Sequence, residues 1–346
     1  MDPDSEDKGT EEQIDIFVLP DGPLIHILSQ LSWKDLLIVR LVSRSFYNFI
    51  HENYGLLNRK KLKDVLIKYD ENCEECPFSV KLSLDTVRTL FLNPLFNDFN
   101  MVKTISFQND EEMSKFLKMF DIRDLHILKI PVVKNIDIFD VLSRSLQMGT
   151  KIEILDVCRL EEKDFTSFRR FIEKLSSINK LVIQHICSPS AEAKDILSDL
   201  SLSSFDTIES FKISECHETK ILSIDMVTDL FRKNPDLTDL IIGSMNIEFL
   251  QIVFKEFFTM EQPLNMRCKN THNAIFLKLH YGGEIKHLVE ILSNVLRELE
   301  NVQELDYSPE PWRRATFVSS KDCKYCLKRK HKISKYVILC EDLLNC

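Results

Sequence analysis

The sequence is poor in glycine and lacks the short motifs of several enzyme classes. Only seven of its 346 residues are glycine, and neither a G-x-G-x-x-G nor a G-x-x-x-x-G-K-[ST] run occurs. Such glycine-rich turns let backbone amides surround nucleotide phosphates, so their absence argues against nucleotide-binding enzymes of these two types. The H-E-x-x-H and G-x-S-x-G patterns of zinc proteases and serine hydrolases are also missing. We expect no cofactor and no enzymatic activity.

The sequence also has no excess of basic residues and no long apolar run. Lysine and arginine number 45 against 54 aspartate and glutamate residues, a net charge of -9. A protein that mainly binds phosphate backbones needs the opposite balance, so we do not expect nucleic acid to be the main partner. No window of about 18 to 20 residues is uncharged and apolar, and residues 1–16 are acidic, unlike a secretory signal. We therefore expect no membrane segment and a protein that stays inside the cell, in the cytoplasm or the nucleus.

Cysteine is present, but its pattern does not indicate a disulfide framework. A chain without a secretory signal meets a reducing environment, so we predict that all ten cysteines are free thiols. Cys73-x-x-Cys76 has the spacing of half a zinc site, but no second pair lies within the usual distance, and a solvated turn is the alternative. We predict no bound metal.

Residues 19–50 carry more large apolar side chains than so short a segment can bury. Leu24, Ile27, Leu28 and Leu31 recur at helical spacing, Ser32-x-x-Asp35 resembles a capping box, and a third apolar segment follows. This pattern predicts three short helices. Because so small a module hides too little of its surface, some of these side chains must face another protein or the rest of the chain, and both alternatives are open.

These residues resemble the F-box family, with its spacing and without insertions. The resemblance is carried by Leu19-Pro20, Ile27-Leu28, Leu31, Asp35-Leu36-Leu37, Val42-Ser43-Arg44 and Phe46-Tyr47. Phe46 stands where many members have tryptophan, and it keeps a bulky aromatic ring. The resemblance implies docking onto a Skp-type adaptor and, through it, onto a cullin carrying a RING subunit. On this basis the adaptor-binding residues are Leu19, Pro20, Leu24, Ile27, Leu28, Leu31, Leu36, Leu37, Val42 and Phe46.

The rest of the chain is dominated by a repeated apolar pattern. Residues 65–69 and 78–84 alternate apolar and polar side chains, which predicts a hairpin. From residue 102 onward the pattern apolar-x-x-apolar-x-apolar recurs eight times, beginning at residues 102, 125, 152, 178, 208, 237, 274 and 302. Segments of helical periodicity lie between these cores, and the longest interval needs an insertion, which we assign to residues 259–273.

This repeat resembles the leucine-rich-repeat-like domains that follow the F-box in many substrate receptors. The fold class that it implies is α/β: a small N-terminal helical F-box followed by an irregular leucine-rich-repeat-like α/β solenoid, or horseshoe. A conventional α/β domain with a parallel sheet is the alternative. The expected domains are a disordered acidic tail (residues 1–16), the F-box (17–54), a linker helix and capping hairpin (55–100), the solenoid (101–310) and a C-terminal cap (311–346).

In such units the side chains between the apolar positions stand on the concave surface of the sheet. That surface mixes charge with apolar patches, as a protein-binding surface does. The loops and the tail are the alternative location for a substrate site. The predicted substrate-binding residues are Ile127, Lys129, Ile154, Asp156, Gln184, Lys212, Ile241, Phe276, Lys278, His280 and Asp306, with Val182 and Glu304 on the same surface.

The C-terminal segment is basic and rich in cysteine. Cys323, Cys326, His331 and Cys340 could form a small zinc site, and the alternative is a strand and helix that cap the solenoid.

Two functions are open for the whole chain. It is either the substrate-recognition subunit of an SCF-type ubiquitin ligase, or a scaffold that binds the adaptor or other proteins without promoting ubiquitination. A ligase with a catalytic cysteine fits less well, because no cysteine is accompanied by a recognisable histidine and acid.

Overall fold

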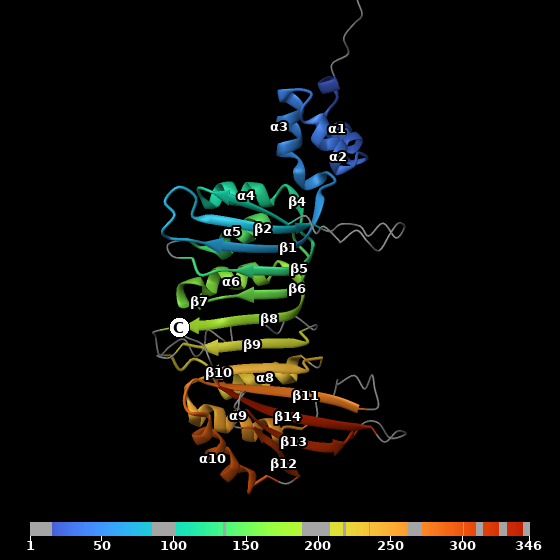
Figure 1. Ribbon diagram of the computed structural model, residues 1–346. Helices are drawn as coiled ribbons and strands as arrows, with labels where there is room; N and C mark the ends of the chain where they lie inside the picture. The colour runs from blue at the N-terminus through green and yellow to red at the C-terminus, as the bar shows by residue number, and fades with distance from the viewer. Residues whose placement is uncertain are drawn as a thin grey trace, which may run out of the picture. The chain divides into compact units, whose positions relative to one another are not determined.

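The computed structural model describes residues 16–84, 102–133, 136–188, 208–216, 219–234, 236–261, 272–299, 301–308, 314–324 and 331–341. The chain divides into two compact units: Met1–Lys60 with Lys118–Asp121, and Lys61–Leu117 with Ile122–Cys346. The first unit is helical and the second is built on one large sheet, so the chain is a mixed α/β protein, as predicted (Figure 1). The predicted acidic tail falls outside the described residues except for Ile16.

The first unit consists of three short helices between two 3-10 turns. The elements are η1 (Ile16–Val18), α1 (Asp21–Ser29), α2 (Trp33–Val39), α3 (Arg44–Glu52) and η2 (Tyr54–Leu56). Serine caps two of them: the Ser32 hydroxyl accepts from the amide of Asp35, and the Ser43 hydroxyl accepts from the amide of Phe46. Each cap satisfies an amide that the first helical turn leaves unpaired. The three helices and the Ser32 cap were predicted from the sequence.

The second unit is organised around a sheet whose central strands are parallel. The strands of the chain, of which β4 belongs to the first unit, are β1 (Lys60–Tyr69), β2 (Phe78–Leu84), β3 (Val102–Phe107), β4 (Phe120–Asp121), β5 (Asp124–Ile130), β6 (Thr150–Val157), β7 (Leu160–Glu161), β8 (Leu175–Cys187), β9 (Ser210–Glu215), β10 (Asp239–Ser244), β11 (His272–Tyr281), β12 (Val302–Ser308), β13 (Arg314–Asp322) and β14 (Lys332–Glu341). Their order is β12-β13-β14-β11-β10-β9-β8-β6-β5-β1-β2-β3. From β5 to β11 the neighbouring strands of this path are parallel and follow the sequence.

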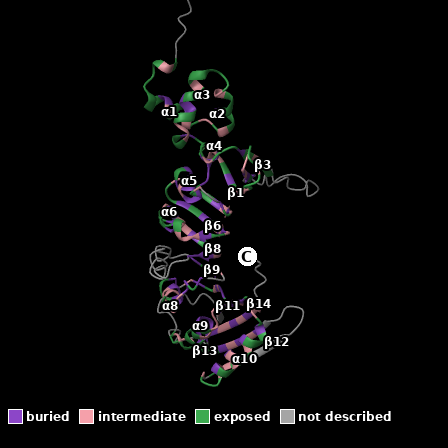
Figure 2. Cartoon of the chain, turned by 90° about the vertical axis from the view of Figure 1, so that its left-hand side faces the viewer, coloured by how far each residue is buried: buried purple, intermediate pink, exposed green. Residues whose placement is uncertain are grey.

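Helices connect these strands and lie on one face of the sheet (Figures 1 and 2). They are α4 (Asp110–Leu117), α5 (Ile138–Ser145), α6 (Phe165–Ile172) after the 3-10 turn η3 (Glu162–Asp164), α8 (Ile224–Lys233), α9 (Ile247–Thr259) and α10 (Ile285–Leu296). Alternate strand residues point to this face and are buried, for example Leu155, Leu181 and Phe211. No described helix covers the opposite face, which we call the open face of the sheet.

All eight predicted apolar cores overlap strands, but the two end cores do not continue the parallel array. Residues 102–107 form β3, which pairs with β2 in the antiparallel sense at one edge. Residues 302–308 form β12, antiparallel to β13 at the other edge. The positions beside β5 and β11 are taken instead by β1 and β14, which come from the predicted hairpin and the predicted C-terminal cap. The hairpin is therefore part of the main sheet, while the finer leucine-rich-repeat geometry stays a prediction.

The prediction that every cysteine is a free thiol is wrong for one pair. Cys187 ends β8 and Cys216 directly follows β9, and the two residues form a disulfide with their Cα atoms 5.5 Å apart. Parallel neighbouring strands bring the ends of successive strand-helix units together, so residues 29 positions apart in sequence become adjacent. Cys73, Cys76 and Cys158 are free thiols.

Candidate functional site

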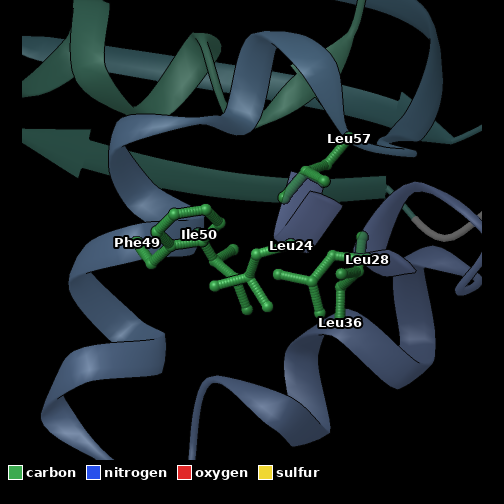
Figure 3. Close-up of a cluster of buried hydrophobic side chains, with 6 residues drawn as sticks. All are labelled: Leu24, Leu28, Leu36, Phe49, Ile50 and Leu57. Carbon is green, nitrogen blue, oxygen red and sulfur yellow. The ribbon is translucent and has the colours of Figure 1, made fainter. Parts of the chain in front are cut away.

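The helices of the first unit enclose a small apolar core. Its members come from all three helices and from the segment after η2 (Figure 3), and they are Leu24, Leu28, Leu36, Phe49, Ile50 and Leu57. Phe17 packs at the edge of this cluster, with its ring centroid 4.8 Å from that of Phe46. This core fixes the relative positions of α1, α2 and α3, and it decides which apolar side chains remain outside.

Many apolar side chains of this unit are exposed. The end of α2 and the turn after it expose four within six residues: Leu37 (45%), Ile38 (64%), Leu41 (86%) and Val42 (68%). We call these four residues the α2 patch. Other exposed apolar side chains of the unit are Val18, Leu19, Ile27, Tyr47 and Leu56. A single exposed leucine is ordinary on a protein surface, but an exposed cluster indicates a surface that another molecule covers.

The structure divides the predicted adaptor-binding residues into two groups. Leu24, Leu28 and Leu36 are 1–3% exposed and belong to the core, so they support the surface and do not form it. Leu31 and Phe46 are partly buried against the same core. The predicted residues that remain exposed are Leu19, Pro20, Ile27, Leu37 and Val42. Helical spacing predicts which residues share a face, but it does not tell which face turns inward.

Ile38, Leu41 and Tyr47 are exposed apolar or aromatic residues that the sequence prediction missed. Residues 36–39 are four consecutive apolar residues of a seven-residue helix, and one side of a helix cannot bury them all. That run was the signal that could have identified Ile38. The exposed Leu41 follows from the turn, in which the amides of Leu41 and Val42 donate to the carbonyls of Ile38 and Val39.

A cationic and aromatic group holds the turn beside the α2 patch. Arg40 donates a hydrogen bond to the Tyr54 hydroxyl, and its guanidinium carbon lies 4.9 Å from the centroid of the Tyr47 ring. Burial is the main cause that raises the pKa of Tyr54, so the phenol stays neutral at physiological pH. The Asn58 amide donates to the carbonyls of Ser29 and Leu31 at 2.7 and 3.0 Å, which ties the loop between α1 and α2 to the segment after α3.

Comparison with protein-family models identifies this unit. Residues 16–59 match the F-box-like family. The match begins at η1 and ends after Leu57, so it includes both the apolar core and the α2 patch. F-box domains bind Skp-type adaptors of SCF ubiquitin ligases, and the F-box-like domain of this chain supports an adaptor-binding role. Comparison of the chain with curated proteins gives no match. Among the described helices, none is long and apolar enough to cross a membrane.

The predicted substrate-binding residues stand in rows on the open face of the sheet. Strand register aligns Lys129, Asp156, Val182, Lys212, Ile241 and Lys278 across six neighbouring strands. A second row contains Ile127, Ile154 and Phe276, and Phe276 stacks on Tyr336 of β14 with ring centroids 5.0 Å apart. His280 and Gln184 lie further along β11 and β8, and the side chain of Asp306 lies outside the described part. Their role in binding stays a prediction.

Several charges on the open face are already paired. Lys129 lies 3.2 Å from Asp156, and the Gln184 amide donates to the same carboxylate at 2.8 Å. Lys278 lies 2.9 Å from Asp239. Lys212, on the central strand β9, forms no ion pair with any described residue. Lys212 is therefore a charge on this face that a partner can neutralise without displacing an existing pair.

A buried carboxyl group stabilises the carboxyl end of β9. The carboxylate of Glu215 accepts from the amides of Ile221 and Leu222 at 3.0 and 3.2 Å and from the Ser244 hydroxyl of the next strand. Burial is the largest influence and raises the pKa of Glu215. This glutamate links β9 to the loop after it and to β10, as the polar ladder of a regular repeat would. The repeat pattern did not reveal it, because acidic residues at strand ends are commonly solvated.

The described residues contain no group of three or more histidine, cysteine or acidic side chains placed to bind a metal. The possible C-terminal zinc site depends on Cys326, which lies outside the described residues. His331 is buried beside the start of β14, and its carbonyl accepts from the amide of Cys323 at 2.9 Å. The absence of bound zinc stays a prediction.

Proposed function

We propose that this protein is the substrate-recognition subunit of an SCF-type ubiquitin ligase. The F-box-like domain docks onto the Skp-type adaptor, and the second unit holds a protein substrate. The protein itself performs no bond chemistry. Ubiquitin transfer is accelerated because the substrate is held near the charged ubiquitin carrier, which raises its effective concentration.

The exposed α2 patch carries the first half of this proposal. Burying a fully exposed leucine, isoleucine or valine side chain stabilises a complex by about 1.5–3 kcal/mol. The patch offers four such side chains on a short segment, held in place by the core below it and by the Arg40 group beside it. A partly apolar surface of the adaptor would cover them.

The open face of the sheet supports the second half. It combines apolar side chains with cations that form no ion pair with a described residue, among them Lys212 on its central strand. A protein substrate with an acidic segment would complement this charge. The loops remain the alternative location, and the experiment below separates the two.

Adaptor binding is tested by expressing the wild-type chain in cells and asking whether a Skp-type adaptor and a cullin co-purify with it. Leu41→Asp places a charge in the α2 patch and should abolish capture of both partners. Ile252→Asp is the matched control, because Ile252 is an apolar residue of α9 that is 48% exposed and lies outside the F-box-like domain. Retention of the adaptor by Leu41→Asp overturns the docking surface. A wild-type chain that binds adaptor without cullin favours the scaffold function.

Substrate binding is tested by proximity labelling under proteasome inhibition. Proteins labelled by the wild type should be labelled less by Lys212→Glu and should accumulate when Leu41→Asp is expressed. Lys278→Glu is a poor probe of the same surface, because it would place a second carboxylate beside Asp239 and disturb the sheet. Unchanged labelling by Lys212→Glu would move the substrate site to the loops.

A further inference from the structure

A cavity lies between the helices α8 and α9 and the sheet face that they cover. Its volume is about 170 Å³, and its lining includes residues at the end of α9 and at the end of β13. The six apolar residues that line it are Phe231, Leu237, Phe258, Met260, Ile275 and Ile333. An apolar cavity of about 150 Å³ accommodates benzene, so this space is large enough for one leucine or phenylalanine side chain.

Lys335 brings a cationic group into this apolar cavity. It lies on β14 facing α9, where its ammonium donates to the carbonyls of Phe257 and Met260 at 2.7 and 2.6 Å. Two carbonyls occupy two of its three N–H groups, and no described carboxylate pairs with it. Burial, and secondarily the charge of Lys321, lower the pKa of Lys335 to about 8, which shows that the positive charge is poorly compensated.

The remaining charges at the cavity do not neutralise Lys335. Lys324 pairs with Glu261 at 3.2 Å, so these two cancel. Lys321 and Asp322 are neighbours in sequence and are both exposed at the end of β13. With all five groups ionised the lining carries one net positive charge, and Lys335 is the only one of the five that is not exposed. The electrostatic stabilisation of a bound anion is therefore largest beside Lys335.

We propose that this cavity binds a carboxylate attached to an apolar group the size of a leucine or phenylalanine side chain. The apolar walls receive the side chain, and Lys335 receives the carboxylate with its third N–H. A phosphate carries a second negative charge, which the single net positive charge of the lining does not compensate. Two sources present this chemistry, namely the C-terminal residue of a polypeptide and a free small carboxylic acid. The inference stands apart from the proposed function, since every lining residue belongs to the second unit.

The test is calorimetric titration of the full-length chain with N-acetyl-leucine and, as the uncharged match, N-acetyl-leucinamide. The acid should bind at least about tenfold more tightly than the amide, because a hydrogen bond to a charged group is worth that factor or more. A short peptide ending in leucine, with a free or an amidated C-terminus, identifies the source. Tighter binding of the free-ended peptide than of N-acetyl-leucine assigns the cavity to polypeptide C-termini, and the reverse assigns it to a small acid.

Variants locate the site. Lys335→Met should weaken binding of the acid by about tenfold or more, whereas Lys332→Met, at an exposed lysine of the same strand, should leave it unchanged. Ile275→Phe fills the cavity from the start of β11 and should block the acid as well. The inference is overturned if the wild type binds neither acid nor peptide at millimolar concentration, if acid and amide bind alike, or if Lys335→Met binds as the wild type does. The wild-type comparison of acid with amide needs no variant to fold.

Discussion

Leu41→Ala distinguishes a residue of the docking surface from a residue of the folding core. Leu41 is 86% exposed, so its truncation should alter the free energy of unfolding by no more than about 0.5 kcal/mol. If the adaptor covers Leu41, the same truncation removes about 2 kcal/mol of apolar burial from the complex. At about 1.4 kcal/mol for each factor of ten, the dissociation constant should rise about 30-fold.

Leu28→Ala is the contrasting variant. Leu28 is 3% exposed within the core of the F-box-like domain, so its truncation leaves a cavity and should cost about 2–5 kcal/mol of stability. A domain of this size has little stability to lose. Adaptor binding by Leu28→Ala should therefore fall together with the helical circular dichroism signal, whereas in Leu41→Ala it should fall alone.

The assay is titration of the purified adaptor with each full-length variant, beside thermal melting followed by circular dichroism. Ile38→Ala repeats the measurement at a second member of the α2 patch, which is 64% exposed. If Leu41→Ala and Ile38→Ala both bind within about twofold of the wild type at unchanged melting temperature, the α2 patch is not the docking surface. The reasoning from exposure to contact would then be refuted for this domain.

Three further outcomes are expected in the second unit. The pKa of Lys335 is lowered from 10.5 to about 8 in the folded chain. Between pH 8 and 10.5 the unfolded chain therefore binds more protons than the folded chain, and the free energy of unfolding rises with pH. Denaturant titrations at pH 8 and 10 should show this rise in the wild type and not in Lys335→Met. Glu215→Leu leaves the amides of Ile221 and Leu222 without an acceptor and should lower the free energy of unfolding by about 1–3 kcal/mol, and a change below about 0.5 kcal/mol would contradict the assigned role. Cys216→Ser removes the bond to Cys187 and should cost about 2–5 kcal/mol, and a reducing buffer should bring the melting temperature of the wild type down to that of the variant.

The strands could be predicted from the sequence because the spacing of apolar residues within each strand indicates which of them are buried. In β6, Ile152, Leu155 and Val157 are almost fully buried, as the repeated apolar pattern indicates. The order of strands in the sheet is not indicated by the sequence of any single strand. Strand β14 pairs with β11 on one side and with β13 on the other. The alternation of apolar and polar residues along β14 does not indicate either neighbouring strand. The prediction therefore took this strand for a cap.

The F-box-like domain shows the same limit at the scale of one helix. Leu36 and Leu37 are adjacent and chemically identical, but Leu36 is 2% exposed and Leu37 is 45% exposed. Which of them turns inward depends on α1 and α3, whose positions are set by contacts far apart in sequence. Family resemblance supplied the domain without supplying this assignment. The cavity at Lys335 could not be predicted at all, because its lining joins α8, α9, β11, β13 and β14.

The place of β14 has a consequence for synthesis of the chain on the ribosome. Strand β11 ends at Tyr281, but its neighbour β14 spans Lys332–Glu341, so about fifty residues must be translated before the first residue of β14 can pair with β11. Until then β11 presents an open edge of unpaired backbone groups, which is the kind of surface that recruits strands from other chains or holding chaperones. A premature stop codon between residues 282 and 331 would make that transient state permanent.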